Sequence, residues 1–271
     1  MTLRKLIIEA LASEPCRTVL TGIARVPVGR WAMNAISSPY GWYATFDEAW
    51  TTARKTVPVG HEDPHEIEFH LRNFDALRPS DYAAVYWISM IHPRNPKVFD
   101  WGGNAGNLYY SYSPRLLGSG SIEWTVFDIP SVLENGRKIA ADRKTCGLRF
   151  ADSVHAFESG QILLVSGAFH YWEHDITGFL LQFQNPPRHI IINRSPVQET
   201  QPSFITVQRT QTCAFPCKVW NCDELVSSFA SSGYKLIDRW RAMELSLKLP
   251  LFPKLSVPYY SGFYFSKDGR G

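Results

Sequence analysis

The run Lys97-Val-Phe-Asp-Trp-Gly-Gly-Asn-Ala-Gly106 decides how this 271-residue chain is expected to fold. A short apolar strand ends in an acidic residue, a glycine-rich turn follows at once, and the next residues can open a helix. The glycines allow a sharp bend and a close approach of the backbone to a ligand. Such a unit is typical of an open α/β sheet, where ligands bind beyond the carboxyl ends of the strands. Taken alone, it is also compatible with an ordinary strand-to-helix turn.

Strands and helices alternate after this unit. The stretches 131–141 and 175–184 favour helices, and the candidate strands lie at 97–99, 123–127, 148–150, 161–165 and 189–192. This alternation predicts a parallel sheet with helices on both faces, whose right-handed crossovers bring the strand ends to one edge. A capped helix from Asn221 to Gly233 and two strands at 234–240 and 259–265 predict a closing antiparallel hairpin.

The first 94 residues are expected to be mostly helical, with helices near 3–11, 45–54, 65–77 and 80–91. We expect them to form a cap that contributes to substrate binding or dimerisation. The domain proper is expected to span 95–271. The segment 195–220 is predicted to be a long loop after the fifth strand.

The composition indicates an ordinary globular protein, with 45% hydrophobic and 20% charged residues and a net charge of only +3. Scattered charges give no reason to expect a nucleic acid or an anionic membrane as partner. No run approaches the ~18 apolar residues of a membrane span, and the first residues do not form a convincing signal peptide, so we expect a cytoplasmic protein. The cysteine count is odd, which does not suit a closed disulfide framework. No metal is expected at Cys213, Cys217 and Cys222, because the spacing lacks a CxxC pair.

Several of the predicted strands end in residues with useful chemistry. Asp100 ends the first and Asp128 the second, and an acid at the second position can accept hydrogen bonds from both ribose hydroxyls of a nucleotide. The third ends at Asp152-Ser153 and the fourth at Ser166-Gly167. Four such ends in order are more specific than any one motif.

These motifs resemble those of a known enzyme family. Asp100-x-Gly102-x-Asn104-x-Gly106 resembles the D/E-x-G-x-G-x-G turn of class I S-adenosylmethionine-dependent methyltransferases, with Asn in place of the middle glycine. Val126-Phe-Asp-Ile-Pro130 resembles the D-L-P motif of small-molecule O-methyltransferases. Leu164 to Trp172 is similar to their fourth-strand segment, which ends L-H-x-W, and the chain also resembles a bacterial family classed only as methyltransferases. The resemblance covers roughly residues 95–271.

The resemblance implies a Rossmann-like α/β fold with a mostly parallel sheet, a C-terminal antiparallel hairpin and an N-terminal helical region. It implies S-adenosylmethionine as the cofactor and S-adenosylhomocysteine as its product. The cofactor's methionine end would lie at the glycine turn, its ribose at Asp128 and its adenine near Asp152. The implied cofactor-binding residues are Asp100, Trp101, Gly102, Gly103, Asn104, Gly106, Asp128, Ile129, Asp152, Ser153, Ser166 and Gly167.

The resemblance makes His170 the general base that removes a proton from a substrate hydroxyl. An imidazole titrates near neutral pH and suits that role. Tyr171 stands where many relatives have Asp, and is included as a second candidate catalytic residue. Methyltransferases that act on acidic acceptors need no base, so His170 as a mere lining residue stays open.

Two other readings of the sequence remain. His170-Tyr-Trp-Glu173-His174 matches H-x-x-E-H, a zinc-peptidase pattern that requires a helix. Because an apolar strand runs straight into these residues, a strand-end turn is more natural, with Glu173 and His174 at the start of a helix. The third reading is a scaffold protein that binds the cofactor without catalysis.

The expected partner is a small-molecule methyl acceptor, with oxygen as the favoured acceptor atom. Its contacts are expected from the N-terminal helices and from the 195–220 loop, whose amides and aromatic rings suit a polar organic molecule. The residues considered are Gln198, Gln201, Phe204, Gln208, Arg209 and Phe215. Related O-methyltransferases often pair through N-terminal helices, so a homodimer is compatible with the resemblance.

Overall fold

The computed structural model describes residues 41–54, 77–116, 120–209, 214–249 and 252–267, with a few isolated residues between 19 and 29. The strands are β1 (Lys97–Trp101), β2 (Glu123–Phe127), β3 (Leu148–Ala151), β4 (Ile162–Ser166), β5 (His189–Gln198), β6 (Phe204–Arg209), β7 (Ala214–Asn221), β8 (Lys235–Ala242) and β9 (Tyr260–Ser266). The α-helices are α4 (Phe46–Arg54), α6 (Asp81–Ile91), α7 (Asn107–Tyr112), α8 (Pro130–Asp142), α9 (Ile176–Leu180) and α10 (Cys222–Ser231). Short 3₁₀ turns are η1 (Ser113–Arg115), η2 (Val154–Ala156), η3 (Phe169–Tyr171) and η4 (Pro253–Leu255).

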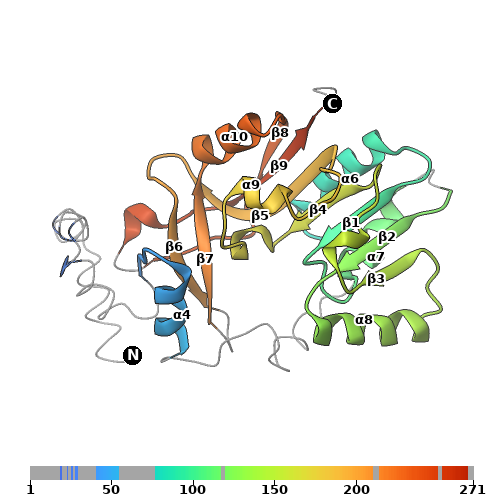
Figure 1. Cartoon of the computed structure of the whole chain (residues 1–271), viewed down its shortest axis with the longest axis horizontal. Helices are drawn as coiled ribbons and strands as arrows, with labels where there is room; N and C mark the ends of the chain where they lie inside the picture. The colour runs from blue at the N-terminus through green and yellow to red at the C-terminus, as the bar shows by residue number, and fades with distance from the viewer. Residues whose placement is uncertain are drawn as a thin grey trace.

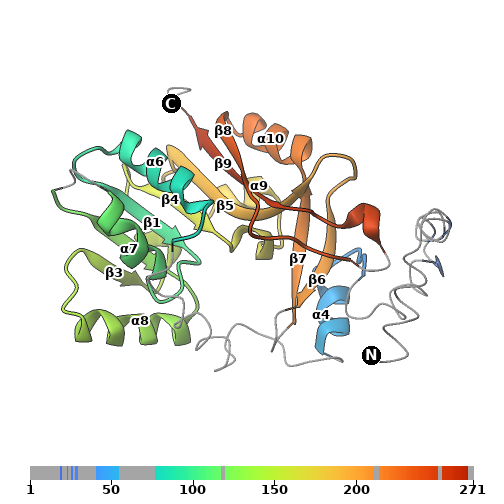
Figure 2. The same cartoon turned by 180° about the vertical axis from the view of Figure 1, so that it is seen from behind.

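The sheet has the predicted open α/β arrangement (Figures 1 and 2). Strands β3, β2, β1, β4 and β5 lie side by side in that order, and each neighbouring pair is parallel. Strand β9 pairs antiparallel with β5, and β8 pairs antiparallel with β9, as the predicted closing hairpin requires. The parallel order confirms that the ends of β1 to β5 meet at one edge.

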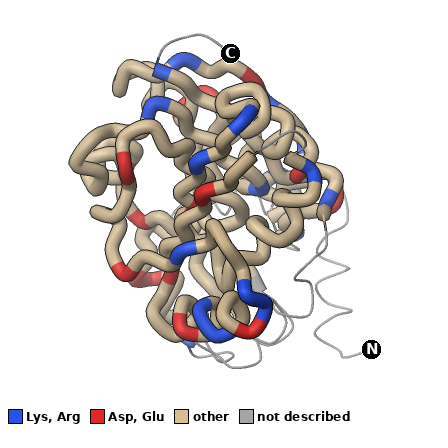
Figure 3. The backbone as a smooth tube through the Cα atoms, turned by 90° about the vertical axis from the view of Figure 1, so that its right-hand side faces the viewer, with Lys and Arg blue, Asp and Glu red and all other residues tan. Residues whose placement is uncertain are grey.

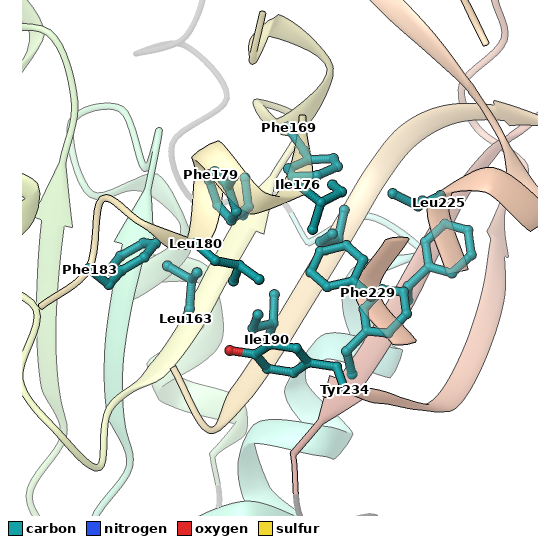
Figure 4. Packing of buried hydrophobic residues seen from close by; sticks show 14 of the residues in the cluster. Leu163, Phe169, Ile176, Phe179, Leu180, Phe183, Ile190, Leu225, Phe229 and Tyr234 are labelled. Carbon is teal, nitrogen blue, oxygen red and sulfur yellow. The ribbon is translucent and has the colours of Figure 1, made fainter. Parts of the chain in front are cut away.

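Helices cover both faces of this sheet. On one face α6, α7 and α8 contribute Ile88, Tyr112 and Leu133 to an apolar cluster against Trp124 and Leu164 of the strands. On the other face, α9 and α10 enclose a cluster rich in phenylalanine, which Figure 4 shows between β4, β5 and the two helices. Burial on both faces explains why β4 and β5 read as continuous apolar runs instead of alternating ones.

The prediction of a loop over 195–220 is wrong. Strand β5 continues to Gln198 past an irregularity between Ile192 and Ser195, and β6 and β7 form an antiparallel hairpin. The far end of β5 pairs with β7 at Val197 and Trp220. The β-branched and aromatic residues of β6 and β7 favour strands, but interspersed glutamines and Pro216 made the segment read as a loop. The predicted helix 175–184 is also shorter, because α9 spans only Ile176–Leu180.

The described helices before β1 pack against different parts of the molecule. Helix α4 covers the β6–β7 hairpin, with Ala49 and Ala53 against Val207 and Ala214. Before α4, Tyr43 donates its backbone N–H to the carbonyl oxygen of Ile205 in β6 at 2.9 Å. Helix α6 packs on the sheet itself. The helices predicted at 3–11 and 65–77 lie outside the described residues, so the domain boundary near residue 94 stays a prediction.

Acidic and basic residues are interspersed on the face seen in Figure 3, as the sequence indicated. Among the described residues, no helix is long and apolar enough to cross a membrane. Among the described cysteines, Cys217 and Cys222 are buried free thiols and Cys146 is an exposed one.

Candidate functional site

The turn between β1 and α7 is built for residues without side chains. Gly102 and Gly106 have φ angles of +73° and +89°, which glycine adopts without strain. A Cβ on Gly102 would lie 2.4 Å from the Cβ of Ala168, and one on Gly103 would lie 2.5 Å from the Asp100 carboxyl carbon. The turn therefore packs closely against Ala168, just after β4, and against the side chain of Asp100.

Asn104 replaces a glycine in this turn without disrupting it. Its φ angle is +56°, and Asn is among the few residues with a side chain that tolerate the left-handed region. Its side-chain oxygen accepts the backbone N–H of Ala105 at 2.7 Å. The departure from the family pattern at Asn104 therefore preserves the backbone shape.

Asp128 directly follows β2 and connects the glycine turn to this strand through hydrogen bonds. Its carboxylate accepts the backbone N–H groups of Asn104 and of Ile129, both at 2.7 Å. Burial raises the pKa of Asp128, and the two amide hydrogen bonds act in the opposite direction. Each carboxylate oxygen has a second lone pair, so the group can still accept two hydrogen bonds from a ligand.

Asp100 is completely buried beside the turn. One of its oxygens accepts the indole N–H of Trp124 at 3.1 Å, and the other has no hydrogen-bond partner among the described residues. Burial is the main cause that raises the pKa of Asp100 to about 7; the nearby Asp128 acts in the same direction, and the hydrogen bond from Trp124 acts against it. A buried acceptor without a donor calls for an explanation such as a missing ligand.

The ends of β3 and β4 hold the remaining predicted cofactor residues. Asp152 forms an ion pair with Arg137 of α8 at 2.6 Å, and the Ser153 hydroxyl accepts the His155 backbone N–H. Ser166 accepts a hydrogen bond from the Arg194 guanidinium at 2.9 Å. Gly167 has a φ angle of +76°. All the predicted cofactor residues therefore lie at the carboxyl ends of four neighbouring strands.

Trp101 and Ile129 flank the two acids. The Trp101 ring lies edge-on to Trp172 and Phe179, and its buried indole N–H has no partner among the described residues. Ile129 stands at the N-cap position of α8. Trp101 thus adds a second unsatisfied polar atom to the edge of β1.

His170 and Tyr171 lie on η3, directly after β4. His170 is only 2% exposed, and its ring centre is 4.2 Å from that of Tyr171 and 6.0 Å from that of Tyr260. The Tyr171 hydroxyl donates to Gln208 Oε1 of β6 at 3.2 Å. Tyr171 therefore faces the β6–β7 hairpin, and His170 lies between Tyr171 and Tyr260 of β9.

The end of β5 and the β6–β7 hairpin bring several expected acceptor contacts to this region. Phe204 and Phe215 are buried, and Phe215 lies edge-on to Tyr171. The Gln198 side-chain nitrogen is buried without a partner among the described residues. These residues belong to strands, so their positions are fixed by pairing and not by a loop.

No protein-family model matches the sequence, and no curated protein matches it. Among solved structures, the magnesium protoporphyrin IX methyltransferase of Synechocystis PCC 6803 with bound SAM aligns over 76% of this chain and 93% of that one. The sequence identity is 10% and the TM-score is 0.50. The chain has the class I methyltransferase fold.

Two further methyltransferases of known structure align with TM-scores below 0.5. The 1,6-didemethyltoxoflavin N1-methyltransferase of Burkholderia thailandensis is 16% identical over 78% of this chain and 92% of that one, with a TM-score of 0.48. The mitomycin 7-O-methyltransferase is 15% identical over 93% of this chain and 72% of that one, also with a TM-score of 0.48.

The zinc reading of His170, Glu173 and His174 finds no support. His170 lies in a 3₁₀ turn and the other two residues lie in the irregular segment before α9, so the helix that the motif needs is missing. Glu173 instead accepts the indole N–H of Trp50 at 3.4 Å. In the described part of the chain, no group of three potential metal ligands gathers.

Sequence reasoning missed Arg194 at the same edge. It follows the apolar part of β5, as Asp100 and Asp128 follow theirs, so the same pattern could have revealed it. Its partner Asp81 comes from α6, 113 positions earlier in the chain, and that pairing has no local signal.

Proposed function

We propose that this protein transfers a methyl group from S-adenosylmethionine to a small-molecule acceptor, with oxygen as the favoured atom. The observation that carries the proposal is the pair of acids around the glycine turn, the fully buried Asp100 and the partly buried Asp128. Among the described residues, one oxygen of Asp100 has no donor, and both oxygens of Asp128 can still accept hydrogen bonds.

These residues fit the cofactor's functional groups. The α-ammonium of its methionine end is a donor that the buried Asp100 oxygen lacks, and an ammonium nearby would favour the ionised carboxylate. The ribose hydroxyls are donors for Asp128. The backbone amides at the start of α7 favour the methionine carboxylate, because helix N-termini attract anions.

The bound cofactor supplies an electrophilic methyl group on its sulfonium. The chain's own residues then have to orient the acceptor, exclude water and accept one proton. Methyl transfer is an in-line displacement, so holding the acceptor atom in line supplies much of the rate. The rigid strands β6 and β7 would provide that orientation through Tyr171 and its contact with Gln208.

We assign the proton acceptor to His170. It follows β4 directly, and it lies among the rings of Tyr171 and Tyr260 with 2% exposure. A general base within hydrogen-bond reach of a hydroxyl contributes about 10²–10⁴-fold to a rate. His170→Gln should therefore lower kcat by that order while leaving cofactor affinity within a factor of about two.

A non-catalytic role is the second candidate function, and the low exposure of His170 favours it. Incubation with methyl-labelled S-adenosylmethionine and a panel of phenols, carboxylic acids, amines and sugars separates the two. Label in any product that disappears in His170→Gln supports the enzyme. Cofactor binding without turnover across the whole panel would favour the scaffold.

A further inference from the structure

The β6–β7 hairpin divides its side chains between two faces. Helix α4 covers one of them, where it packs against Val207 and Ala214 (Figure 1). Successive residues of a strand point to opposite faces, and paired residues share a face. The second face, named the Thr206 face here, consists of Phe204, Thr206 and Gln208 of β6 with Val219, Cys217 and Phe215 of β7. The Thr206 face is thus the one turned away from α4.

The Thr206 face packs against residues from the C-terminal part of the chain. Three of its residues belong to one apolar cluster, whose C-terminal members are Leu247, Leu249, Phe252, Leu255, Val257 and Tyr260. Tyr171 packs against the same cluster, and its ring lies edge-on to Phe215 with 6.0 Å between the ring centres. Aromatic and aliphatic side chains of this kind line most small-molecule sites. The surroundings of Thr206 are therefore mostly apolar.

Thr206 places an unpaired hydroxyl in these apolar surroundings. The residue is completely buried, and its hydroxyl has no hydrogen-bond partner among the described residues. A threonine hydroxyl can donate one hydrogen bond and accept two. Leaving it unpaired in the interior is destabilising, so a native protein that keeps such a group calls for an explanation. A ligand oxygen that bonds to Thr206 supplies one.

The Thr206 face and the apolar cluster on it contain no charged residue among those described. Burial raises the pKa of the Cys217 thiol to about 12 and that of the Tyr260 hydroxyl well above its ordinary value, so both stay neutral. Lys218 belongs to the opposite face, and its ammonium lies 3.7 Å from the centre of the Trp220 ring. An ion without a countercharge is costly to bury. A ligand group on the Thr206 face is therefore expected to be uncharged.

The rim of the Thr206 face lies beside the proposed reaction centre. The Tyr171 hydroxyl donates to Gln208 Oε1 at 3.2 Å, and both residues are half-buried. Tyr171 directly follows His170, the assigned proton acceptor. Thr206 lies two residues before Gln208 on the same face, which is about 7 Å along the strand. The face therefore extends from this half-buried rim to the buried hydroxyl of Thr206.

We propose that the methyl acceptor binds against the Thr206 face and that Thr206 selects it through one hydrogen bond. The acceptor is then an uncharged, largely apolar molecule with a carbonyl or hydroxyl oxygen that pairs with the Thr206 hydroxyl. Its methyl-accepting atom lies at the other end, near His170. This inference rests on the proposed function and narrows it, because it excludes acceptors that carry a carboxylate or phosphate at the Thr206 end.

Three benzene derivatives of similar shape test the site. Acetophenone carries an uncharged carbonyl, ethylbenzene has no oxygen, and benzoate has a negative charge. Their dissociation constants are measured by ligand-observed NMR titration of the full chain, with and without saturating S-adenosylhomocysteine. We expect the wild type to bind acetophenone about 3-fold to 10-fold more tightly than ethylbenzene. Benzoate should bind at least about 10-fold more weakly than acetophenone, because its charge finds no partner.

Thr206→Val is the main variant, because it removes the hydroxyl and changes the side-chain shape little. It should abolish the preference for acetophenone over ethylbenzene, a change of about 3-fold to 10-fold. Since it also removes an unpaired buried hydroxyl, the melting temperature of the ligand-free protein should rise by about 2–6 °C.

Two further variants separate the hydroxyl from the fold. Thr206→Ser keeps the hydroxyl and should keep the preference for acetophenone. Thr125→Val is the matched control, because it removes a hydroxyl of β2 that accepts a hydrogen bond from Gln161 at 3.5 Å. It should leave the preference for acetophenone unchanged. A preference lost in Thr206→Val alone supports the proposal.

A gain in stability in Thr206→Val with an unchanged preference overturns the proposal, since the hydroxyl then has no role in binding. Wild-type protein that binds no acetophenone, or binds benzoate as tightly, overturns it as well. If the wild type does not bind S-adenosylhomocysteine, the proposed function fails instead. The ratio of acetophenone to ethylbenzene affinity in the nucleoside-free protein then still decides whether Thr206 binds a ligand, so the two failures can be told apart.

Discussion

Asp100→Asn is expected to make the ligand-free protein more stable while it weakens cofactor binding. The carboxyl group is completely buried, and one oxygen already accepts the Trp124 indole N–H. The asparagine amide oxygen can keep that hydrogen bond and carries no charge. The substitution therefore removes the desolvated charge without opening a cavity.

The magnitude follows from the pKa of Asp100. Burial raises it from an ordinary 3.8 to about 7 in the folded protein. At about 1.36 kcal/mol per pKa unit, ionising the buried group above pH 7 costs about 4 kcal/mol, which is an upper estimate for the gain. For a chain of this size, 1 kcal/mol corresponds to about 2 °C, so we expect the melting temperature at pH 8 to rise by about 2–8 °C.

The direction of the Asp100 pKa shift determines the pH range over which the stability changes. Because the folded pKa is above the unfolded one, the wild type loses stability as pH rises from about 4 to about 7 and is level above that. Asp100→Asn lacks this slope, so the two proteins should converge near pH 4 and differ most at pH 8. Urea unfolding of both proteins at four pH values measures this directly, with the exposed Asp142→Asn as control.

The same variant should bind S-adenosylhomocysteine about 10-fold more weakly, because the α-ammonium loses a charged acceptor. An Asp100→Asn protein that is less stable than the wild type at pH 8, or that keeps the wild-type slope between pH 4 and 7, would refute the reasoning about this buried acid.

Two further predictions concern the glycine turn and η3. Gly102→Ala should cost about 2–4 kcal/mol of stability, since it adds the strain of a positive φ angle to a Cβ contact of 2.4 Å with Ala168. Gly160 has a φ angle of +92° and open space around it, so Gly160→Ala should cost only about 1 kcal/mol. Equal losses for the two variants in urea unfolding would contradict the steric argument. Tyr171→Phe removes the hydroxyl contact with Gln208. It should raise the KM for the acceptor several-fold and leave cofactor affinity unchanged. A loss of S-adenosylhomocysteine binding in calorimetry would show that Tyr171 contributes to the cofactor site instead.

Much of the sheet was predictable because its signals are local. Asp100 and Asp128 each follow a short apolar run and precede a turn, and the structure brings both to one edge. The end of α10 was marked by Gly233, which has a φ angle of +84°. Strand boundaries, glycine turns and helix caps depend on neighbours in sequence, so a pattern is enough.

The hairpin and the pairing of Arg194 were not predictable for the opposite reason. Strands β6 and β7 are stabilised by pairing with the end of β5 and by α4, which are distant in the chain. Arg194 is held by Asp81 and Ser166 from two other elements. Such contacts between distant residues leave no periodicity in the sequence, and neither does the register shift of β5 between Ile192 and Ser195.

The central claim is that the edge of β1 and β2 binds S-adenosylmethionine. Calorimetric titration of the wild type and of Asp128→Ala with S-adenosylmethionine and S-adenosylhomocysteine tests it most directly, with Asp142→Ala as a matched surface control. The account predicts micromolar binding by the wild type and the control, and a loss of at least about 10-fold in Asp128→Ala, because the ribose hydroxyls lose their acceptor. No binding by the folded wild type, or equal binding by Asp128→Ala, would contradict it.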